Sequence, residues 1–446
     1  MKSKLAIVVL AAGQGTRMKS ALPKVLHRIG GRPMLSHVLD AARNLGAARI
    51  VVVRAADTQG VADLAREWDA ETIVQERQLG TGHAVLAAEA MLKGFDGDLL
   101  VLFGDSPLLT PATLARLLER LKSGADLAAL GFKAADPAGY GRMITEGDLL
   151  RRIVEEKDAS EAERRVNLCF AGMLAGNARK LFEILHKIGN KNAQGEFYLT
   201  DAIALAGKAG LICAVVEGSE AEMLGVNSRA QLASAEAAFQ SRKRAELMDA
   251  GVGFAAPETV YLSADTVIES DVVIGPYVVI GPCVTIRKGA EIRAFSHLEG
   301  AEIGVGAIVG PFARLRPGTV LEKDVHVGNF VEVKNARLED GAKVNHLSYV
   351  GDARVGAETN IGAGTITCNF DGAEKHFTDI GANVFIGSDA TLVAPVKIGD
   401  GAYVAAGSTI TEDVEADALA IGRGRQVAKP GRAKTLRAKL KAKGKD

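Results

Sequence analysis

The sequence predicts two architectures in one chain, an α/β domain followed by a parallel β-helix. In the first half, apolar runs alternate with amphipathic segments, a pattern that favours a sheet covered by helices on both faces. In the second half, an aliphatic residue stands at nearly every sixth position from Leu262 to Ile410. A chain of 446 residues also exceeds one ordinary core, so at least two domains are expected.

The α/β prediction begins with four apolar runs that read as strands of a mixed, mostly parallel sheet, at residues 4–10, 49–54, 71–76 and 98–103. Between the first two runs, Pro33 to Leu45 places its apolar residues on one helical face. Thr110 followed by Pro111 predicts the start of another helix, as an N-cap and first-turn pair. In sheets of this kind, ligands bind beyond the carboxyl ends of the strands.

The β-helix prediction depends on the period of six, which neither an amphipathic helix nor a two-residue strand alternation produces. A solenoid of short flat strands does produce it, because each strand contributes one inward side chain before a turn. The inward aliphatic positions are Leu262, Ile268, Ile274, Ile280, Ile286, Ile292, Leu298, Val309, Leu315, Leu321, Val327, Val333, Leu338, Val344, Val350, Ile380, Ile386, Leu392, Ile398, Val404 and Ile410. Between Ile366 and Ile380 the period fails, which predicts a loop that projects from the coil.

Local signals divide the chain further. Ser228 and Gln231 form a capping-box pattern at the start of a helical segment. The C-terminal segment holds ten Lys or Arg residues and one Asp, with few large apolar groups, and is expected to be disordered. The expected divisions are an α/β domain at 1–227, a linker helix at 228–250, a β-helix domain at 251–422 and a basic tail at 423–446.

Charge and cysteine content exclude several classes of protein. Basic and acidic residues are equal at 54 each, which gives no global attraction to nucleic acid, and no apolar run approaches the length of a membrane span. We therefore expect neither nucleic-acid binding nor membrane insertion. The four cysteines lie far apart, and no signal peptide precedes them, so a reduced, cytoplasmic location is expected.

The segment from residue 10 to residue 24, LAAGQGTRMKSALPK, is the strongest local signal in the chain. It places two glycines where the backbone can approach a ligand, followed by the cations Arg17 and Lys24. A dinucleotide fingerprint would need Gly where Met18 stands, and a Walker loop would need Lys directly after its last Gly. Both of those phosphate loops are excluded.

This segment resembles the signature of the sugar-phosphate nucleotidyltransferases. QLGTGHA, FGDSPL, DPAGYGR, IVEEKDA, NAQGEFYLTD and GVNSR follow it in order, ahead of the hexapeptide pattern. Together they resemble the bacterial family of bifunctional N-acetylglucosamine-1-phosphate uridyltransferases and glucosamine-1-phosphate N-acetyltransferases, over almost the whole length. The resemblance implies UTP, N-acetylglucosamine 1-phosphate, glucosamine 1-phosphate and acetyl-CoA as ligands, Mg²⁺ as a cofactor, a left-handed coil and a homotrimer built through it.

The resemblance also assigns residues to uridylyl transfer, in which charge must be neutralised and two reactants aligned. Arg17 and Lys24 match the cations at the triphosphate, and Asp105 and Asn227 match the magnesium ligands, two oxygen donors of the type this ion takes. The other positions that match the nucleotide and sugar sites are Leu10, Ala11, Gly13, Gln75, Gly80, Thr81, Gly104, Gly139, Glu155 and Phe170.

Phe170 departs from the family, which has Asn at this position of the sugar site. A phenyl ring makes none of the hydrogen bonds of an amide, and an unpaired sugar hydroxyl costs about 1–3 kcal/mol. Weakened sugar binding and an altered substrate are both open, and we expect reduced uridylyl transfer.

A second chemistry is expected on the outside of the coil, where His346 and three other polar residues lie off the inward register. Acetyl transfer needs an acceptor for the proton of the attacking amine, and His titrates nearest neutrality. The resemblance makes His346 the base, with Arg316, Lys334, Tyr349 and Asn360 holding the sugar phosphate. It assigns acetyl-CoA to Ala363, Asn369, Phe370, Ser388, Ala406 and Arg423, where Phe370 replaces the usual Tyr and loses a hydroxyl.

Two other functions are compatible with parts of this pattern. One is a monofunctional nucleotidyltransferase whose β-helix serves only for assembly, against which the outward cations and His346 argue. The other is a scaffold that binds sugar nucleotide without turnover, which Phe170 keeps open.

Overall fold

The N-terminal half of the chain folds around a nine-stranded mixed sheet with the order β5-β4-β1-β6-β10-β7-β11-β9-β8. The computed structural model describes residues 4–443, and these divide into two compact units between Ala245 and Glu246. The strands of this sheet are β1 Leu5–Ala11, β4 Arg49–Arg54, β5 Glu71–Val74, β6 Asp98–Phe103, β7 Leu127–Lys133, β8 Arg142–Glu146, β9 Leu149–Val154, β10 Leu168–Asn177 and β11 Cys213–Glu217. The four predicted runs are therefore β1, β4, β5 and β6.

The sheet is parallel from β5 to β6, and beyond β6 it is mixed, with β11 again parallel to β7. Strands β4, β1 and β6 pair in parallel, whereas β10 runs antiparallel to both β6 and β7. The fold class predicted for this half, α/β with a mixed sheet, is confirmed. Because β1 and β6 are parallel neighbours, the segments that follow their carboxyl ends lie side by side.

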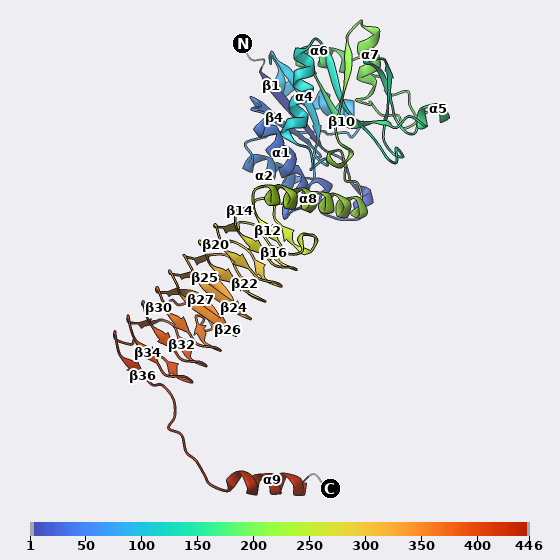
Figure 1. Cartoon of the computed structure of the whole chain (residues 1–446). Helices are drawn as coiled ribbons and strands as arrows, with labels where there is room; N and C mark the ends of the chain where they lie inside the picture. Colours follow the sequence, from blue (N-terminus) through green and yellow to red (C-terminus); the bar gives the residue numbers. More distant parts are fainter. Residues whose placement is uncertain (1–3, 444–446) are drawn as a thin grey trace. The chain divides into compact units, whose positions relative to one another are not determined.

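Helices cover both faces of the sheet, as Figure 1 shows. Side chains of β1 alternate between two buried clusters: Ile7 and Val9 pack with helices α1, α2 and α4, and Ala6 and Val8 pack with α3, α6 and α7. The helices are α1 Met34–Asn44, α2 Gln59–Glu67, α3 Thr81–Ala87, α4 Pro111–Lys122, α5 Glu161–Arg164, α6 Ala178–Leu185 and α7 Asp201–Lys208. Helix α4 begins as predicted, with the Thr110 hydroxyl accepting a hydrogen bond from the Thr113 N–H at 3.3 Å.

Two short strands and several 3-10 helices lie between the longer elements. The two-residue strands β2 Arg28–Ile29 and β3 Arg32–Pro33 form a small hairpin. The 3-10 helices are η1 Thr16–Met18, η2 Lys24–Leu26, η3 Glu89–Leu92, η4 Glu220–Glu222 and, in the second half, η5 Pro257–Thr259.

The predicted linker helix is α8, which spans Arg229–Asp249. The Ser228 hydroxyl accepts from the Gln231 N–H at 3.3 Å, which is one half of the predicted capping box. The other half differs, because the Gln231 side chain accepts from the N–H of Asn227 at 2.8 Å instead of that of Ser228. The helix thus begins two residues after Asn227, a predicted metal ligand.

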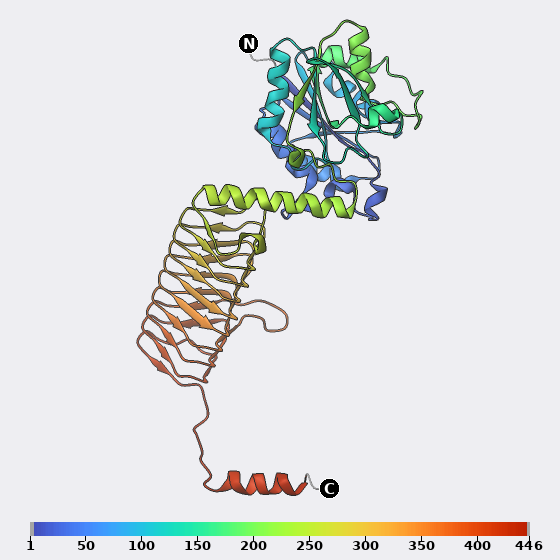
Figure 2. The ribbon, with the colours of Figure 1, turned by 45° about the vertical axis from the view of Figure 1, so that its right-hand side comes forward.

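The second half forms a parallel β-helix (Figures 1 and 2), and its interior is a continuous cluster of apolar side chains. Every inward aliphatic position of the predicted series is buried. In most of the two-residue strands, the residue before the inward one points outward. Strands of successive coils pair in parallel, as Val273–Ile274 does with Glu291–Ile292. The period of six therefore corresponds to one strand and one turn.

The coil has three flat sides. Strands β12 Gly253–Phe254, β15 Val273–Ile274, β18 Glu291–Ile292, β21 Ile308–Val309, β24 His326–Asn329, β26 Lys343–His346, β28 Asn360–Ile361, β31 Phe385–Ile386, β34 Tyr403–Val404 and β36 Leu419–Ala420 form the first. The second holds β13 Tyr261–Leu262, β16 Val279–Ile280, β19 His297–Leu298, β22 Arg314–Leu315, β29 Ile366–Cys368, β32 Thr391–Val393 and β35 Thr409–Ile410. The third holds β14 Val267–Ile268, β17 Thr285–Ile286, β20 Ala301–Ile303, β23 Thr319–Leu321, β30 Thr378–Ile380 and β33 Val396–Ile398. Strands β25 Glu332–Leu338 and β27 Tyr349–Val355 run through both the second and the third side.

The predicted interruption is a loop between β29 and β30, which leaves the coil in Figure 2. Beyond the last coil, the expectation of disorder differs from the structure, in which Arg432–Lys443 form helix α9. Ala, Leu, Lys and Arg are strong helix formers, which accounts for the local structure of this segment. Among residues 4–443, no helix is long and apolar enough to cross a membrane.

Candidate functional site

The first candidate site is a cleft at the carboxyl ends of β1 and β6. Leu10 and Ala11 end β1, and Phe103 and Asp105 lie at the end of β6. Gly104, between them, is buried, and a Cβ there would lie 3.2 Å from the Leu10 carbonyl oxygen. The cleft is lined by Leu10, Ala11, Ala12, Gly13, Gln14, Gly15, Thr16, Lys24, Val25, Gln75, Gln78, Gly80, Thr81, Ala84, Phe103, Asp105 and Glu196.

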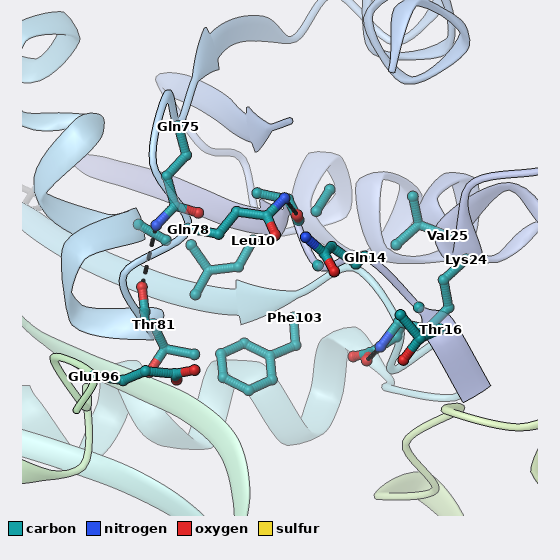
Figure 3. Close-up of a pocket in the computed structure, with 17 residues that line it drawn as sticks. Leu10, Gln14, Thr16, Lys24, Val25, Gln75, Gln78, Thr81, Phe103 and Glu196 are labelled. Atoms are coloured by element: carbon teal, nitrogen blue, oxygen red, sulfur yellow. Dashed lines mark hydrogen bonds and ion pairs between the residues drawn. The ribbon is translucent and has the colours of Figure 1, made fainter. Parts of the chain in front are cut away.

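The glycine-rich loop forms one side of this cleft, with Thr16 and Lys24 at the right in Figure 3. Gly15 has φ +60°, and a Cβ there would lie 2.7 Å from the Lys24 Cβ. Gly15 therefore lets the loop pass closely over Lys24 in a conformation that other residues rarely adopt. Arg17, by contrast, lies on η1 with its side chain exposed and is not among the cleft-lining residues of the described chain.

Lys24, Asp105 and Asn227 meet at the floor of the cleft. The Lys24 ammonium group donates to Asp105 Oδ2 in an ion pair and to Asn227 Oδ1 at 2.9 Å. Both side chains of the ion pair are largely buried, with exposed fractions of 12% and 16%. The two predicted metal ligands therefore converge on one cation, which in this structure is an ammonium group.

The same two oxygens fit the donor set of Mg²⁺, which retains waters and takes phosphate oxygens for its remaining positions. Among residues 4–443, no group of three or more His, Cys, Asp or Glu side chains is arranged to hold a metal. An all-protein metal cage is therefore absent from the described residues, and the arrangement suits an ion that arrives with a triphosphate.

The opposite end of the cleft carries amide groups. Gln75 is buried, and its side-chain N–H₂ donates to the Gly80 carbonyl oxygen at 3.2 Å, a bond drawn in Figure 3. Gly80 has φ +111°, and a Cβ there would lie 2.6 Å from the Phe197 carbonyl oxygen. The Thr81 hydroxyl accepts from the Leu199 N–H at 3.0 Å. Gln75, Gly80 and Thr81 are thus brought together, as predicted.

Sequence reasoning assigned no role to four polar residues that line this cleft, Gln14, Thr16, Gln78 and Glu196. Gln78 donates to the Ala12 carbonyl oxygen at 2.7 Å and so ties the wall to the glycine-rich loop, and Glu196 lines the cleft beside Thr81. Both stand inside quoted motifs, QLGTGHA and NAQGEFYLTD, so the signal was present without a role attached to these positions.

A second cleft adjoins the first, because Thr81, Phe103, Asp105 and Glu196 line both. It contains the predicted sugar positions Gly139, Glu155 and Phe170, as well as Asn227. The Thr200 hydroxyl donates to Glu155 Oε1 at 3.0 Å. Burial raises the pKa of Glu155, and the nearby carboxylate of Asp201 acts in the same direction, whereas the Thr200 bond opposes it.

Phe170 forms an apolar part of the sugar-side wall. Its side chain is 8% exposed and belongs to the buried cluster that also contains Met143 and Ile153. Its N–H donates to the Gly141 carbonyl oxygen at 2.8 Å, so the backbone is held in the sheet region. The ring therefore has a packing role at a position that faces the cleft.

The second candidate site lies on the outside of the β-helix around His346. The ring Nδ1 of His346 is 2.8 Å from Asn329 Oδ1, one coil earlier in the paired strand. An amide oxygen only accepts hydrogen bonds, so Nδ1 is the donor in this contact, and in the neutral imidazole the lone pair is on Nε2. The exposed Nε2 can therefore accept a proton.

His346 begins a regular row of residues on successive coils. Ala363, Ser388 and Ala406 each stand two positions after an inward aliphatic residue, as His346 does after Val344. Arg423 closes the row, because its guanidinium donates to the Ala406 carbonyl oxygen at 2.6 Å. With adjacent strands about 4.8 Å apart, the row from His346 to Ala406 spans about 15 Å.

Three of the four predicted phosphate-holding residues lie on or next to strands of the second side of the coil, whereas Asn360 lies on the first side with His346. Arg316 and Lys334 occupy equivalent positions on neighbouring coils, and Tyr349 lies opposite Glu332 in the next coil. Arg316 pairs with Glu332 at 2.7 Å, which raises the pKa of its guanidinium. Asn360 pairs with Lys343 in the strand register of the first side.

Asn369 and Phe370 belong to the loop between β29 and β30. Asn369 is buried, and its amide donates to the Tyr349 hydroxyl at 3.4 Å and to Asp352 Oδ2. Phe370 is exposed and forms an isolated antiparallel bridge with Lys375. Sequence reasoning missed Asp352 and Lys375, because Asp352 lies in the regular part of the coil and Lys375 lies in the predicted loop with no role attached to it.

Comparison with known families gives two matches that agree with this division. A MobA-like NTP transferase domain matches residues 7–167, and bacterial transferase hexapeptide repeats match residues 265–300 and 377–412. The hexapeptide match and the parallel coil confirm the predicted left-handed parallel β-helix.

Curated relatives cover nearly the whole chain. The bifunctional protein GlmU of Ruegeria sp. (strain TM1040) is 57% identical over 442 residues, with 98% of both chains covered. That of Cereibacter sphaeroides (strain ATCC 17025 / ATH 2.4.3) is 56% identical, covering 97% of this chain and 95% of the relative. That of Azorhizobium caulinodans is 56% identical over 97% of each. The chain therefore belongs to the family of bifunctional GlmU proteins.

Proposed function

We propose that the two sites carry out successive steps of UDP-N-acetylglucosamine synthesis. The coil transfers acetyl from acetyl-CoA to glucosamine 1-phosphate, and the α/β cleft then transfers uridylyl from UTP to N-acetylglucosamine 1-phosphate with release of pyrophosphate. The observation that supports this best is that one chain of a bifunctional family holds two chemically different sites. One is a cleft with the largely buried ion pair of Lys24 and Asp105, and the other is the exposed His346, whose Nδ1 is hydrogen-bonded to Asn329. We assign acetyl transfer to residues 251–422 and uridylyl transfer to residues 1–227.

In the α/β cleft, the glycine-rich loop supports a site for the triphosphate. Its backbone, from Leu10 to Gly13, lines the cleft beside Lys24, so N–H groups and a cation can face the phosphates. The amide of Gln75 suits the uracil edge at the far end. Arg17, exposed in this structure, reaches the phosphates only if its side chain turns toward the cleft. Mg²⁺, held by Asp105 and Asn227 when bound, supplies charge neutralisation at the triphosphate.

The adjoining cleft supports the place of the sugar phosphate. Gly139 and Glu155 lie in it together with the ring of Phe170, and it shares Asp105 with the nucleotide cleft. A sugar phosphate placed there has its phosphate next to the triphosphate, as attack on the α-phosphorus requires.

On the coil, the amine of glucosamine 1-phosphate attacks the thioester carbonyl carbon, a C–N bond forms, and the C–S bond breaks. His346 Nε2 accepts the proton from the amine and passes it to the departing sulfur, so coenzyme A leaves as the thiol. Arg316, Lys334, Tyr349 and Asn360 bind the sugar phosphate in this proposal. The row of small side chains after His346 offers an extended track of about 15 Å, which suits the long arm of acetyl-CoA, with Arg423 at its far end.

A homotrimer built through the coil belongs to the same proposal. Four aromatic rings stack along one corner of the coil, Tyr277, Phe295, Phe312 and Phe330, with centroids 4.8–5.2 Å apart. Each is about half exposed, between 45% and 56%. Contiguous exposed apolar surface of this kind is typical of a protein–protein interface. The four cysteines are free, which fits the reducing cytoplasm that we propose as its location.

The test uses the full-length chain in two assays. Release of free thiol from acetyl-CoA with glucosamine 1-phosphate reports acetyl transfer, and release of pyrophosphate from UTP with N-acetylglucosamine 1-phosphate and Mg²⁺ reports uridylyl transfer. We expect both. Pyrophosphate without thiol release would instead establish the monofunctional enzyme, and nucleotide binding with neither product would establish the scaffold. Light scattering of the same material measures the number of chains.

A further inference from the structure

Three polar side chains stack on successive coils beneath the second site. Asn335 donates to Asp352 Oδ1 at 2.6 Å, and Asn369 donates to Asp352 Oδ2 from the other side. Asp352 is 8% exposed. Asn335 and Asp352 have φ of +43° and +47°, a conformation in which Asn and Asp are enriched. A buried carboxylate thus lies between two amide donors.

Two lysines surround this carboxylate. Lys334 precedes Asn335, and Lys375 comes from the loop between β29 and β30. Burial opposes ionisation of Asp352, but the bonds from Asn335 and Asn369 and the charges of the lysines outweigh it, so its pKa is lowered. The pKa of Lys375 is also lowered, chiefly by the neighbouring Lys334 and its positive charge, whereas Asp352 acts to raise it. Asp352 is therefore the anion that offsets the repulsion between two adjacent cations.

The loop at this point is a small hairpin with its own internal bonds. Asp371 Oδ1 accepts from the N–H groups of Ala373 and Glu374 at 2.8 Å each, and Asp371 Oδ2 contacts His376 Nε2 at 2.7 Å. The His376 N–H donates to the Asn369 carbonyl oxygen at 2.8 Å and closes the hairpin. The side chain of Asn369, bonded to Asp352, joins this closed unit to the coil. The orientation of the hairpin on the coil therefore depends on that contact.

We propose that Asp352 is a positioning residue for acetyl transfer, which holds Asn369 in place for acetyl-CoA and keeps Lys334 at the sugar-phosphate site beside Lys375. The inference rests on the proposed acetyl transfer on the coil. It adds a residue that lies under the site and acts through Asn369 and Lys334.

The test replaces Asp352 by Asn in the full-length protein. The substitution keeps the size of the side chain and removes its charge and one of its two acceptor oxygens. We expect the KM for acetyl-CoA and for glucosamine 1-phosphate to rise, and kcat/KM to fall about ten- to a hundredfold, the factor for loss of a charge-assisted hydrogen bond. We expect kcat at saturating substrates to change far less, because His346 and Asn329 are untouched.

The matched control is Asp379→Asn, which makes the same chemical change in an ion pair with Arg354 on another side of the coil. If Asp352 were only structural, both variants would lower acetyl transfer in proportion to their loss of thermal stability. That result, or KM values within twofold of wild type for Asp352→Asn, would overturn the proposal. If the wild type itself released no thiol while uridylyl transfer was normal, the proposed function of the coil would fail instead.

A second variant covers the case in which Asp352→Asn does not fold. Asn335→Gly keeps the carboxylate and its charge, tolerates the positive φ, and removes one of the two amides that fix the orientation of the carboxylate. We expect a smaller rise in the KM for acetyl-CoA with kcat retained. Unchanged KM values in a folded Asn335→Gly protein would contradict the positioning role.

Discussion

Lys24 occupies the position in which the predicted metal ligands converge, and this makes metal affinity testable without any turnover. Its ammonium group bonds to both Asp105 and Asn227. A divalent ion that enters without nucleotide must break the bond to Asp105 and then remain close to the displaced positive charge. We therefore expect the free protein to bind Mg²⁺ or Mn²⁺ weakly, and UTP to improve metal binding by drawing Lys24 to its phosphates.

The change Lys24→Met removes the charge and keeps most of the side-chain length. A hydrogen bond to a charged group contributes about 1.5–3 kcal/mol, and about 1.4 kcal/mol corresponds to a tenfold change in affinity. Both side chains of the ion pair are more than four-fifths buried, so little of this effect is lost to solvent screening. The variant should bind free Mn²⁺ about ten- to a hundredfold more tightly than wild type, and UTP more weakly.

The assay is Mn²⁺ titration of nucleotide-free protein, followed by electron paramagnetic resonance of the free ion. Lys19→Met is the matched control, since Lys19 is an exposed cation of the same loop. Equal Mn²⁺ affinity in wild type and Lys24→Met would refute the competition. If Lys24→Met and Lys19→Met both bound Mn²⁺ more tightly than wild type, the increase would come from the loss of one positive charge and not from competition at Asp105.

Three further predictions concern single side chains. His346→Ala should lower kcat for acetyl transfer about 10²- to 10⁴-fold, the usual contribution of a general base, with uridylyl transfer unchanged in the same preparation. Phe170→Asn should raise kcat/KM for N-acetylglucosamine 1-phosphate about 5- to 150-fold if the absence of the family's Asn at this position limits uridylyl transfer. Unchanged kinetics would show that Phe170 does not reduce uridylyl transfer. Burial raises the pKa of Glu155, so ionisation of this carboxyl group lowers the free energy of unfolding. The loss begins near the pKa of the unfolded chain, about 4.3, and is complete above the pKa of the folded protein. Urea unfolding should therefore show Glu155→Gln gaining stability over wild type as pH rises, with no difference below pH 4.

Much of the fold was predictable because repetition encodes it locally. Each inward aliphatic residue of the coil lies in an equivalent environment, so the period of six alone identified the buried side chains. In the α/β unit, β1, β4 and β6 were predicted because parallel strands buried on both faces appear as continuous apolar runs, and β5, at the edge of the sheet, was predicted from a shorter apolar run. The antiparallel β10 was not predicted, since the apolar run from Leu168 to Asn177 carries no signal for the direction in which it pairs.

The sites were predicted to a smaller extent, for a different reason. The motif around Gly13 and Lys24 identified residues that the structure brings into one cleft. The sequence contained no signal that Lys24 would bond to Asn227, because this contact joins residues about two hundred positions apart. Asp352 was missed for a similar reason, since its partners come from the coils before and after it and the turn conformation that aligns them is not visible as a motif.

The period that builds the β-helix also sets the spacing of its proposed site. Packing constrains only the inward position of each strand, such as Ile386 or Val404, and leaves the residue two positions later outside the core. Because every coil repeats this geometry, Ser388 and Ala406 recur about one strand spacing apart along one row with His346. Small side chains at these outward positions can therefore make room for an extended ligand without changing the packing of the core. A bulky replacement such as Ser388→Trp should accordingly block acetyl-CoA while leaving the fold intact, and a normal KM for acetyl-CoA in that variant would place the ligand elsewhere.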